Sequence, residues 1–121
     1  MTFFLAVWPE RRALSDKDAA RYYTQLVEGR APQAFDESVY GFSCALTGRF
    51  PDLEMIEDAD LDSSPWASAL EVAGSHILMA VRPELFSSVF PVILQLAEEH
   101  GLVCFDPQNT KVHLPSRLRS N

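Results

Sequence analysis

Residues 76–106, HILMAVRPELFSSVFPVILQLAEEHGLVCFD, decide the fold of this 121-residue chain. The run 76–81 is apolar without polar alternation, 85–100 has helical spacing, and 102–105 is a second apolar run. The pattern predicts a strand, a helix and a strand, with the helix crossing over a sheet. Because a strand without polar alternation is covered on both faces, we expect 76–81 at the centre of the sheet.

The 85–100 segment is expected to bury one helical face and to leave Pro91 on the solvent face. A proline there removes one backbone hydrogen bond and bends the helix without ending it. The alternative is a regular helix that begins only at Pro91. His100 beside Gly101 is typical of a helix C-terminus, so we expect a structural role for this histidine.

The N-terminal third predicts a second central strand and a helix. Both alternating sets of side chains in 3–8 are apolar, so this strand is also expected to be buried on both faces. We expect 3–8 and 76–81 to be neighbouring parallel strands. Ser15 is placed to cap a following helix, and Gly29 is placed to end it.

The segment 36–50 fits two interpretations. As a helix it has Asp36 as its cap and a hydrophobic staple between Phe35 and Tyr40. As a strand it alternates larger and smaller residues, and Gly41 weakens a helix by about 1 kcal/mol. We favour the helix, because the cap and the staple agree with the helical period.

These elements predict one α+β domain over 1–121 with a ferredoxin-like βαββαβ sandwich. The 36–50 helix is extra, inserted after the first helix, and 111–114 is expected to add a C-terminal strand before a tail, 115–121. The bare fold leaves one sheet face open. We expect that face to be covered by 36–50, by the tail or by another subunit.

The net charge of −7 is concentrated in one segment. Residues 36–64 carry eight acids and one base, whereas the rest of the chain is neutral. Most of these acids lie in an acidic loop, residues 52–64, which precedes Trp66. An acidic domain repels the phosphate backbone, so we expect no nucleic-acid partner. The chain shows no signal peptide and no membrane-spanning run, which predicts a cytoplasmic protein without a membrane partner.

Motifs for catalysis, metal binding or a cofactor are not evident. Asp58-x-Asp60-x-Asp62 resembles the start of a calcium loop, but Ser63 and Ala69 stand where glycine and the bidentate glutamate are required. Cys44 and Cys104 lie among apolar neighbours, and we expect both to be buried free thiols. We therefore expect no catalytic residues, no metal and no cofactor.

Three segments together resemble a group of small bacterial proteins of uncharacterised function. They are Trp8-Pro9, Ser64-Pro65-Trp66-Ala67 and the run 100–108, joined by Arg49-Phe50-Pro51-Asp52-Leu53 as an RYPDL-like segment. Proteins of this size and composition are similar to immunity proteins of bacterial toxin systems, which act by binding. This resemblance implies a protein partner and supplies no catalytic residues.

The leading hypothesis is an acidic immunity protein that neutralises a basic toxin by direct binding. The expected partner-binding residues are Glu54, Glu57, Asp58, Asp60, Asp62 and Trp66. The alternative is a small enzyme or ligand-binding domain with a pocket under residues 54–66. A third reading is a structural homo-oligomer, such as a homodimer, in which the acidic loop only keeps the protein soluble.

Overall fold

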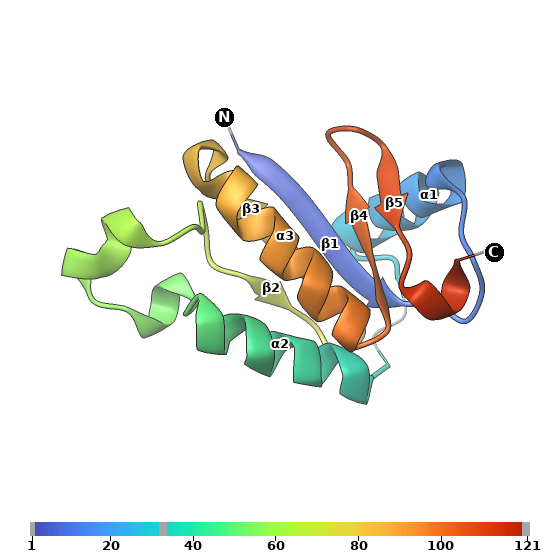
Figure 1. Cartoon of the computed structure of the whole chain (residues 1–121), viewed down its shortest axis with the longest axis horizontal. Coiled ribbons are helices and arrows are strands. Elements are labelled where there is room, and N and C mark those ends of the chain that lie inside the picture. Colours follow the sequence, from blue (N-terminus) through green and yellow to red (C-terminus); the bar gives the residue numbers. More distant parts are fainter. Residues whose placement is uncertain (1, 32–33, 120–121) are drawn as a thin grey trace.

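The computed structural model describes residues 2–31 and 34–119. One antiparallel sheet has the strand order β2-β3-β1-β4-β5 (Figure 1). The strands are β1 (Phe3–Pro9), β2 (Glu71–Val72), β3 (Ile77–Val81), β4 (Leu102–Asp106) and β5 (Lys111–His113). The helices are α1 (Asp16–Val27), α2 (Glu37–Arg49) and α3 (Pro83–Glu99), with 3-10 helices η1 (Leu53–Met55), η2 (Asp58–Ser63) and η3 (Ser116–Leu118). The predicted α+β class is confirmed.

The two apolar runs are interior neighbours in the sheet, but they run in opposite directions. Leu5 of β1 lies opposite Met79 of β3 in an antiparallel register. The expectation of neighbouring strands is therefore confirmed, and the expectation that they are parallel is wrong. An unbroken apolar run reports burial on two faces, and helices can cover both faces of an antiparallel strand as well as of a parallel one.

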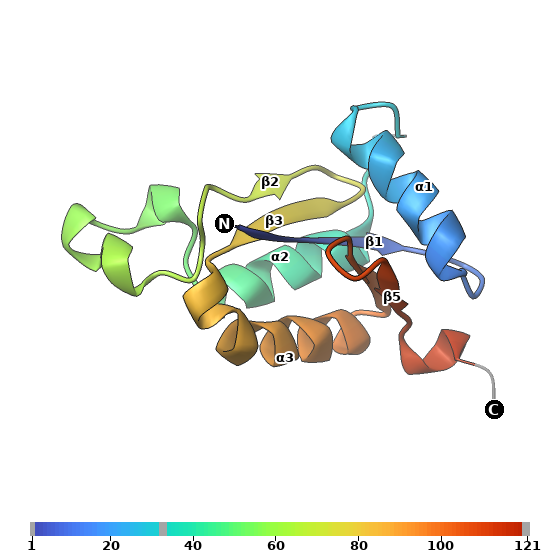
Figure 2. The same ribbon diagram turned by 90° about the horizontal axis from the view of Figure 1, so that it is seen from above.

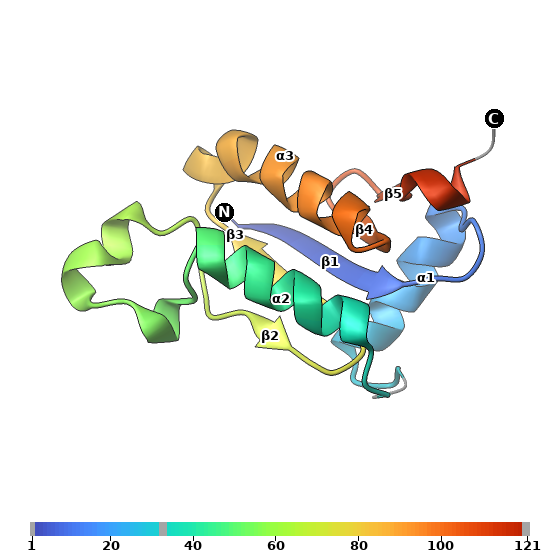
Figure 3. The ribbon, with the colours of Figure 1, turned by 60° about the horizontal axis from the view of Figure 1, so that its bottom comes forward.

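The helices lie on both faces of the sheet, as Figure 2 shows edge-on. Leu5 and Val7 of β1 belong to the core shared with α2 and α3, whereas Ala6 and Trp8 belong to the core shared with α1. Our expectation that 36–50 covers the second face is wrong, whereas the tail contributes to that face, because Leu118 packs against its core. The helix α2 shares its face with α3 (Figure 3), and α1 covers the opposite face.

The helical interpretation of 36–50 is correct, and its predicted start is confirmed. The Asp36 carboxylate accepts hydrogen bonds from the backbone N–H groups of Ser38, at 2.8 Å, and Val39, at 3.2 Å. The rings of Phe35 and Tyr40 lie 6.3 Å apart between centroids, as a hydrophobic staple requires. Local capping therefore outweighs the cost of the two glycines inside this helix.

The long helix α3 begins at Pro83 and continues through Pro91. The alternative start at Pro91 is thus wrong, and Pro91 lies on the exposed face as expected. The helix ends as predicted: Gly101 has φ 68°, and the Nδ1 atom of His100 lies 2.9 Å from the Leu96 carbonyl oxygen. His100 therefore has the structural position that its sequence context indicated.

A side chain from the turn between β4 and β5 makes the hydrogen bonds that a neighbouring strand would make at the start of β1. Before Ala6, β1 has no partner residue on β4. Instead, the Gln108 side-chain amide accepts a hydrogen bond from the Phe4 N–H and donates one, at 2.8 Å, to the Phe4 carbonyl oxygen. Buried Asp106 holds this amide by accepting from Gln108 Nε2 at 2.6 Å. A side chain here takes the place of a strand residue.

The predicted last strand is confirmed as β5, and the chain then turns into η3. The predicted tail, 115–121, extends two residues past the described part of the structure.

The two helices on the same face approach closely at Gly41. A Cβ atom at Gly41 would lie 3.1 Å from Cδ2 of His100, whose ring also packs edge-on against Phe42 with centroids 6.2 Å apart. Nothing lies within 4 Å of the equivalent position at Gly48, in the same helix. The two glycines therefore differ in packing alone.

This difference gives a paired prediction. Gly48→Ala should raise the free energy of unfolding by about 0.5–1 kcal/mol, because alanine favours the helix. Gly41→Ala has the same preference for the helix, but its added methyl group presses on the His100 ring. This variant should therefore be at least about 1 kcal/mol less stable than Gly48→Ala. Urea unfolding of both variants measures the difference. Equal stabilisation would show that the contact between the helices is loose.

Candidate functional site

The acidic loop extends from the body of the protein after α2 (Figures 1 and 2). Two 3-10 helices, η1 and η2, give it local order, so it is more regular than an open loop. None of the residues in either 3-10 helix is buried. The loop is thus a projecting surface, which touches the hydrophobic core through the partly buried Leu53 at its base.

Two side chains at the base hold the two ends of the loop. One carboxylate oxygen of Asp52 accepts hydrogen bonds from the N–H groups of Leu53, at 2.8 Å, and Leu70, at 3.1 Å. The Arg82 guanidinium donates to the carbonyl oxygens of Asp62, at 2.7 Å, and Ser64, at 3.1 Å. These bonds tie the loop to the start of the β2 segment and to the end of β3.

Trp66 lies in the core and not with the other proposed contact residues. Its side chain is 2% exposed, and its indole N–H donates to the Phe50 carbonyl oxygen at 3.0 Å. Because a partner cannot reach a buried ring, the expectation that Trp66 contacts a partner needs correction. Its aromatic surface and its single polar atom are both used to join the two chain segments that flank the loop.

The five acids of the predicted site are all exposed: Glu54, Glu57, Asp58, Asp60 and Asp62. None forms an ion pair with a base in the described part of the chain. Two apolar side chains stand among them, Met55 at 70% and Leu61 at 39% exposure. The loop therefore presents negative charge that no base neutralises, next to apolar side chains that are exposed to solvent.

A cavity of about 300 Å³ lies at the base of the loop, where the alternative hypothesis placed a pocket. Its lining comes from the end of α2 and from the loop: Arg49, Phe50, Pro51, Ile56, Asp60, Ser63, Ser64 and Pro65. No histidine or cysteine lines it. The lining can therefore enclose a small molecule, but it supplies no nucleophile paired with a histidine base.

The fold brings one further set of reactive residue types together. Cys104 on β4 lies directly opposite His113 on β5. Buried Asp106 follows Cys104 by two residues on the same strand. Sequence reasoning missed this pair, because only the strand register brings the two residues together. Cys104 is completely buried, and burial raises the pKa of its thiol far above the usual range, with Asp106 adding to the shift. The thiol stays protonated and is not a nucleophile.

The other cysteine is placed differently from our expectation. Cys44 is a free thiol like Cys104, but it is exposed on α2, so the prediction that both are buried is wrong for this residue. The apolar residues around Cys44 in the sequence lie on the other side of the helix, which faces the core. Within the described residues, no group of three or more His, Cys, Asp or Glu side chains is placed to hold a metal ion.

Comparisons with protein-family models, with curated proteins and with solved structures found no match to this chain. Across the described residues, no helix combines the length and the apolar character that crossing a membrane requires.

The two cysteines should react at different rates. In the folded protein, a thiol reagent such as Ellman's reagent should modify Cys44 quickly, because its side chain is exposed. Cys104 should react only after denaturation, since it is buried and its pKa is raised. Titration before and after adding guanidinium chloride should give one thiol and then two, and rapid reaction of both in the native state would contradict the buried position.

Two histidines should make stability depend on pH. Burial lowers the pKa of His76, against an opposing effect of Glu71, and burial lowers that of His113, against Asp106 and Asp16. Below an unfolded pKa of about 6.5, the unfolded chain binds more protons than the native protein. The free energy of unfolding should therefore fall as pH falls from about 7 to 5.5. Urea unfolding over this interval tests the sign, and constant or rising stability would contradict it.

Proposed function

We propose that this chain is an immunity protein that neutralises a basic toxin by binding it through the acidic loop. The observation that carries the proposal is the set of five exposed acids that no base of the described chain neutralises. A protein that used these charges only for its own stability would pair some of them. Left unpaired on a projecting loop, they are available to a partner.

The physics of the loop supports recognition of a positively charged groove. Clustered negative charge attracts a basic partner before contact and raises the association rate. Met55 and Leu61 then provide apolar surface that loses water on contact, which contributes to affinity. The bonds from Asp52 and Arg82 hold the base of the loop, so less chain entropy is lost on binding than for an untethered segment.

The proposal extends to fold, location and assembly. The order β2-β3-β1-β4, with α2 and α3 on one face, supports a ferredoxin-like arrangement in which α1 and β5 are the additions. A cytoplasmic location fits a protein that meets its toxin inside the producing cell. A homodimer would cover the apolar side chains left exposed beside α1, such as Phe4 and Val27.

A second candidate function is a small-ligand-binding domain. The cavity of about 300 Å³ at the base of the loop favours it, because this volume lies at the lower end of ligand pockets. Its apolar lining and the guanidinium of Arg49 would suit a small, partly apolar anion. In this case Glu54, Glu57, Asp58 and Asp62, which do not line the cavity, would be dispensable for function.

Charge neutralisation separates these functions. Changing the five loop acids to asparagine or glutamine should slow association with a basic toxin encoded beside the chain's gene, roughly 10- to 100-fold at low salt. The effect should shrink near physiological ionic strength, where charges are screened beyond about 8 Å. Unfolding free energy should change by less than about 0.5 kcal/mol for each substitution. Stopped-flow or surface-binding kinetics at several salt concentrations provide the measurement.

The matched control removes five exposed acids elsewhere: Asp18, Glu28, Glu37, Glu71 and Glu99. Both variants then have the same net charge. Two of the control acids, Asp18 and Glu28, form exposed ion pairs, which contribute little to stability. The control should keep most of the association rate. Full protection from the toxin with an unchanged rate in the loop variant would show that the acids only keep the protein soluble.

A further inference from the structure

A second cavity, of about 580 Å³, lies at the other end of α2 from the acidic loop. Asp36 and Ser38, at the start of this helix, line it together with the loop after β1, the turn before β4, and η3. The acidic loop begins after Arg49, at the opposite end of α2 from this cavity. Twelve residue steps of 1.5 Å place these two helix ends roughly 18 Å apart.

The cavity collects positive charge in an acidic protein. Arg11, Arg12 and Arg117 line it, and none forms an ion pair with any residue that the structure describes. Four of the chain's ten bases are in ion pairs, so half of the six others line this one cavity. Guanidinium groups are permanently charged and match the oxygens of phosphate and carboxylate.

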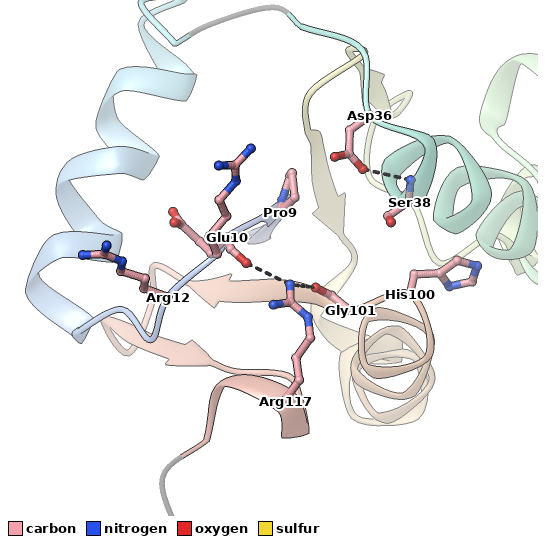
Figure 4. A pocket seen from close by; sticks show the side chains of 9 residues that line it. Pro9, Glu10, Arg12, Asp36, Ser38, His100, Gly101 and Arg117 are labelled. Carbon is pink, nitrogen blue, oxygen red and sulfur yellow. Dashed lines mark hydrogen bonds between the residues drawn. The ribbon is translucent and has the colours of Figure 1, made fainter.

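Arg117 is held in place without being neutralised. Its Nη2 atom donates to the carbonyl oxygens of Glu10 and Gly101, both at 2.8 Å, as Figure 4 shows. Gly101 permits this approach, because a Cβ there would lie 3.2 Å from Arg117 Nε. Both acceptors are uncharged, so the positive charge remains available to an anion.

The other polar residues of the cavity limit the kind of ligand. The Glu10 carboxylate accepts from the Trp8 indole at 2.9 Å, and the Asp36 carboxylate caps α2. Both would repel a bare anion but can accept hydrogen bonds from hydroxyl groups. The His100 ring points away from Arg117 in Figure 4 and is occupied by the Leu96 carbonyl.

We propose that this cavity binds a small phosphate monoester that carries several hydroxyl groups. Arg117 contacts the phosphate, and the exposed side chains of Arg11 and Arg12 turn to it. Arg12 extends away from Arg117 in Figure 4, and it has no hydrogen bond or ion pair with a described residue that would hold it there. The hydroxyl groups face Glu10 and Asp36. This site is separate from the acidic loop and does not depend on the toxin-binding proposal.

Calorimetry with ribose 5-phosphate, at constant ionic strength, tests the site. We expect one saturable site, with no heat from ribose and weaker binding of citrate. Arg11→Gln and Arg12→Gln should each lower the affinity roughly three- to tenfold. Both side chains are exposed and unpaired, so the fold is retained in these variants.

Lys111→Gln is the matched control, because it removes the same charge from an exposed side chain on β5 that does not line the cavity. It should leave the affinity within about twofold of the native value. Absence of saturable binding up to about 10 mM would overturn the proposal, since that affinity is too weak for a specific site. Equal binding of citrate would overturn the phosphate assignment, and an equal loss in Lys111→Gln would show only general charge attraction.

Discussion

Burial of β1 on both of its faces is the constraint on which the rest of the structure depends. Its side chains are apolar in both alternating sets, and Ala6, Val7 and Trp8 are completely inaccessible to water. Burying a large apolar side chain such as Leu5 or Val7 contributes about 1.5–3 kcal/mol, so leaving either face open would cost several kcal/mol. The positions of α1 on one face and of α2 with α3 on the other follow from this requirement. The acidic loop and the arginine-lined cavity occur where the chain leaves this packed centre.

Much of the framework could be predicted because it is local. The Asp36 cap, the Pro91 position and the glycine at the end of α3 depend on neighbours within a few residues. Strand direction and the face chosen by α1 could not be predicted in this way. An apolar side chain records that it is buried, but it does not record which distant segment buries it.

The acidic loop and the arginine-lined cavity also differ in how far the sequence could predict them. Exposure of the loop acids could be expected from composition alone, since unpaired Asp and Glu are rarely buried. The burial of Trp66 could not be expected in this way. Its indole N–H donates to the backbone carbonyl group of Phe50, and a backbone group leaves no signal in the sequence. The arginine-lined cavity could not be predicted either, since Arg11 and Arg117 lie near opposite ends of the sequence and line one cavity only because the fold brings the end of β1 close to η3. The helix α2 thus has excess negative charge beyond one end and excess positive charge at the other.

The Gln108 amide has a consequence for how this protein behaves in a crowded cell. Free N–H and C=O groups along a strand can recruit a strand from another molecule, which is a common start of aggregation. At the beginning of β1 the neighbouring strand is missing, but the amide occupies both backbone groups of Phe4. A foreign strand would have to displace it from Asp106 as well as from Phe4. The central strand of the sheet is in this way closed to intermolecular pairing where it lacks a neighbouring strand.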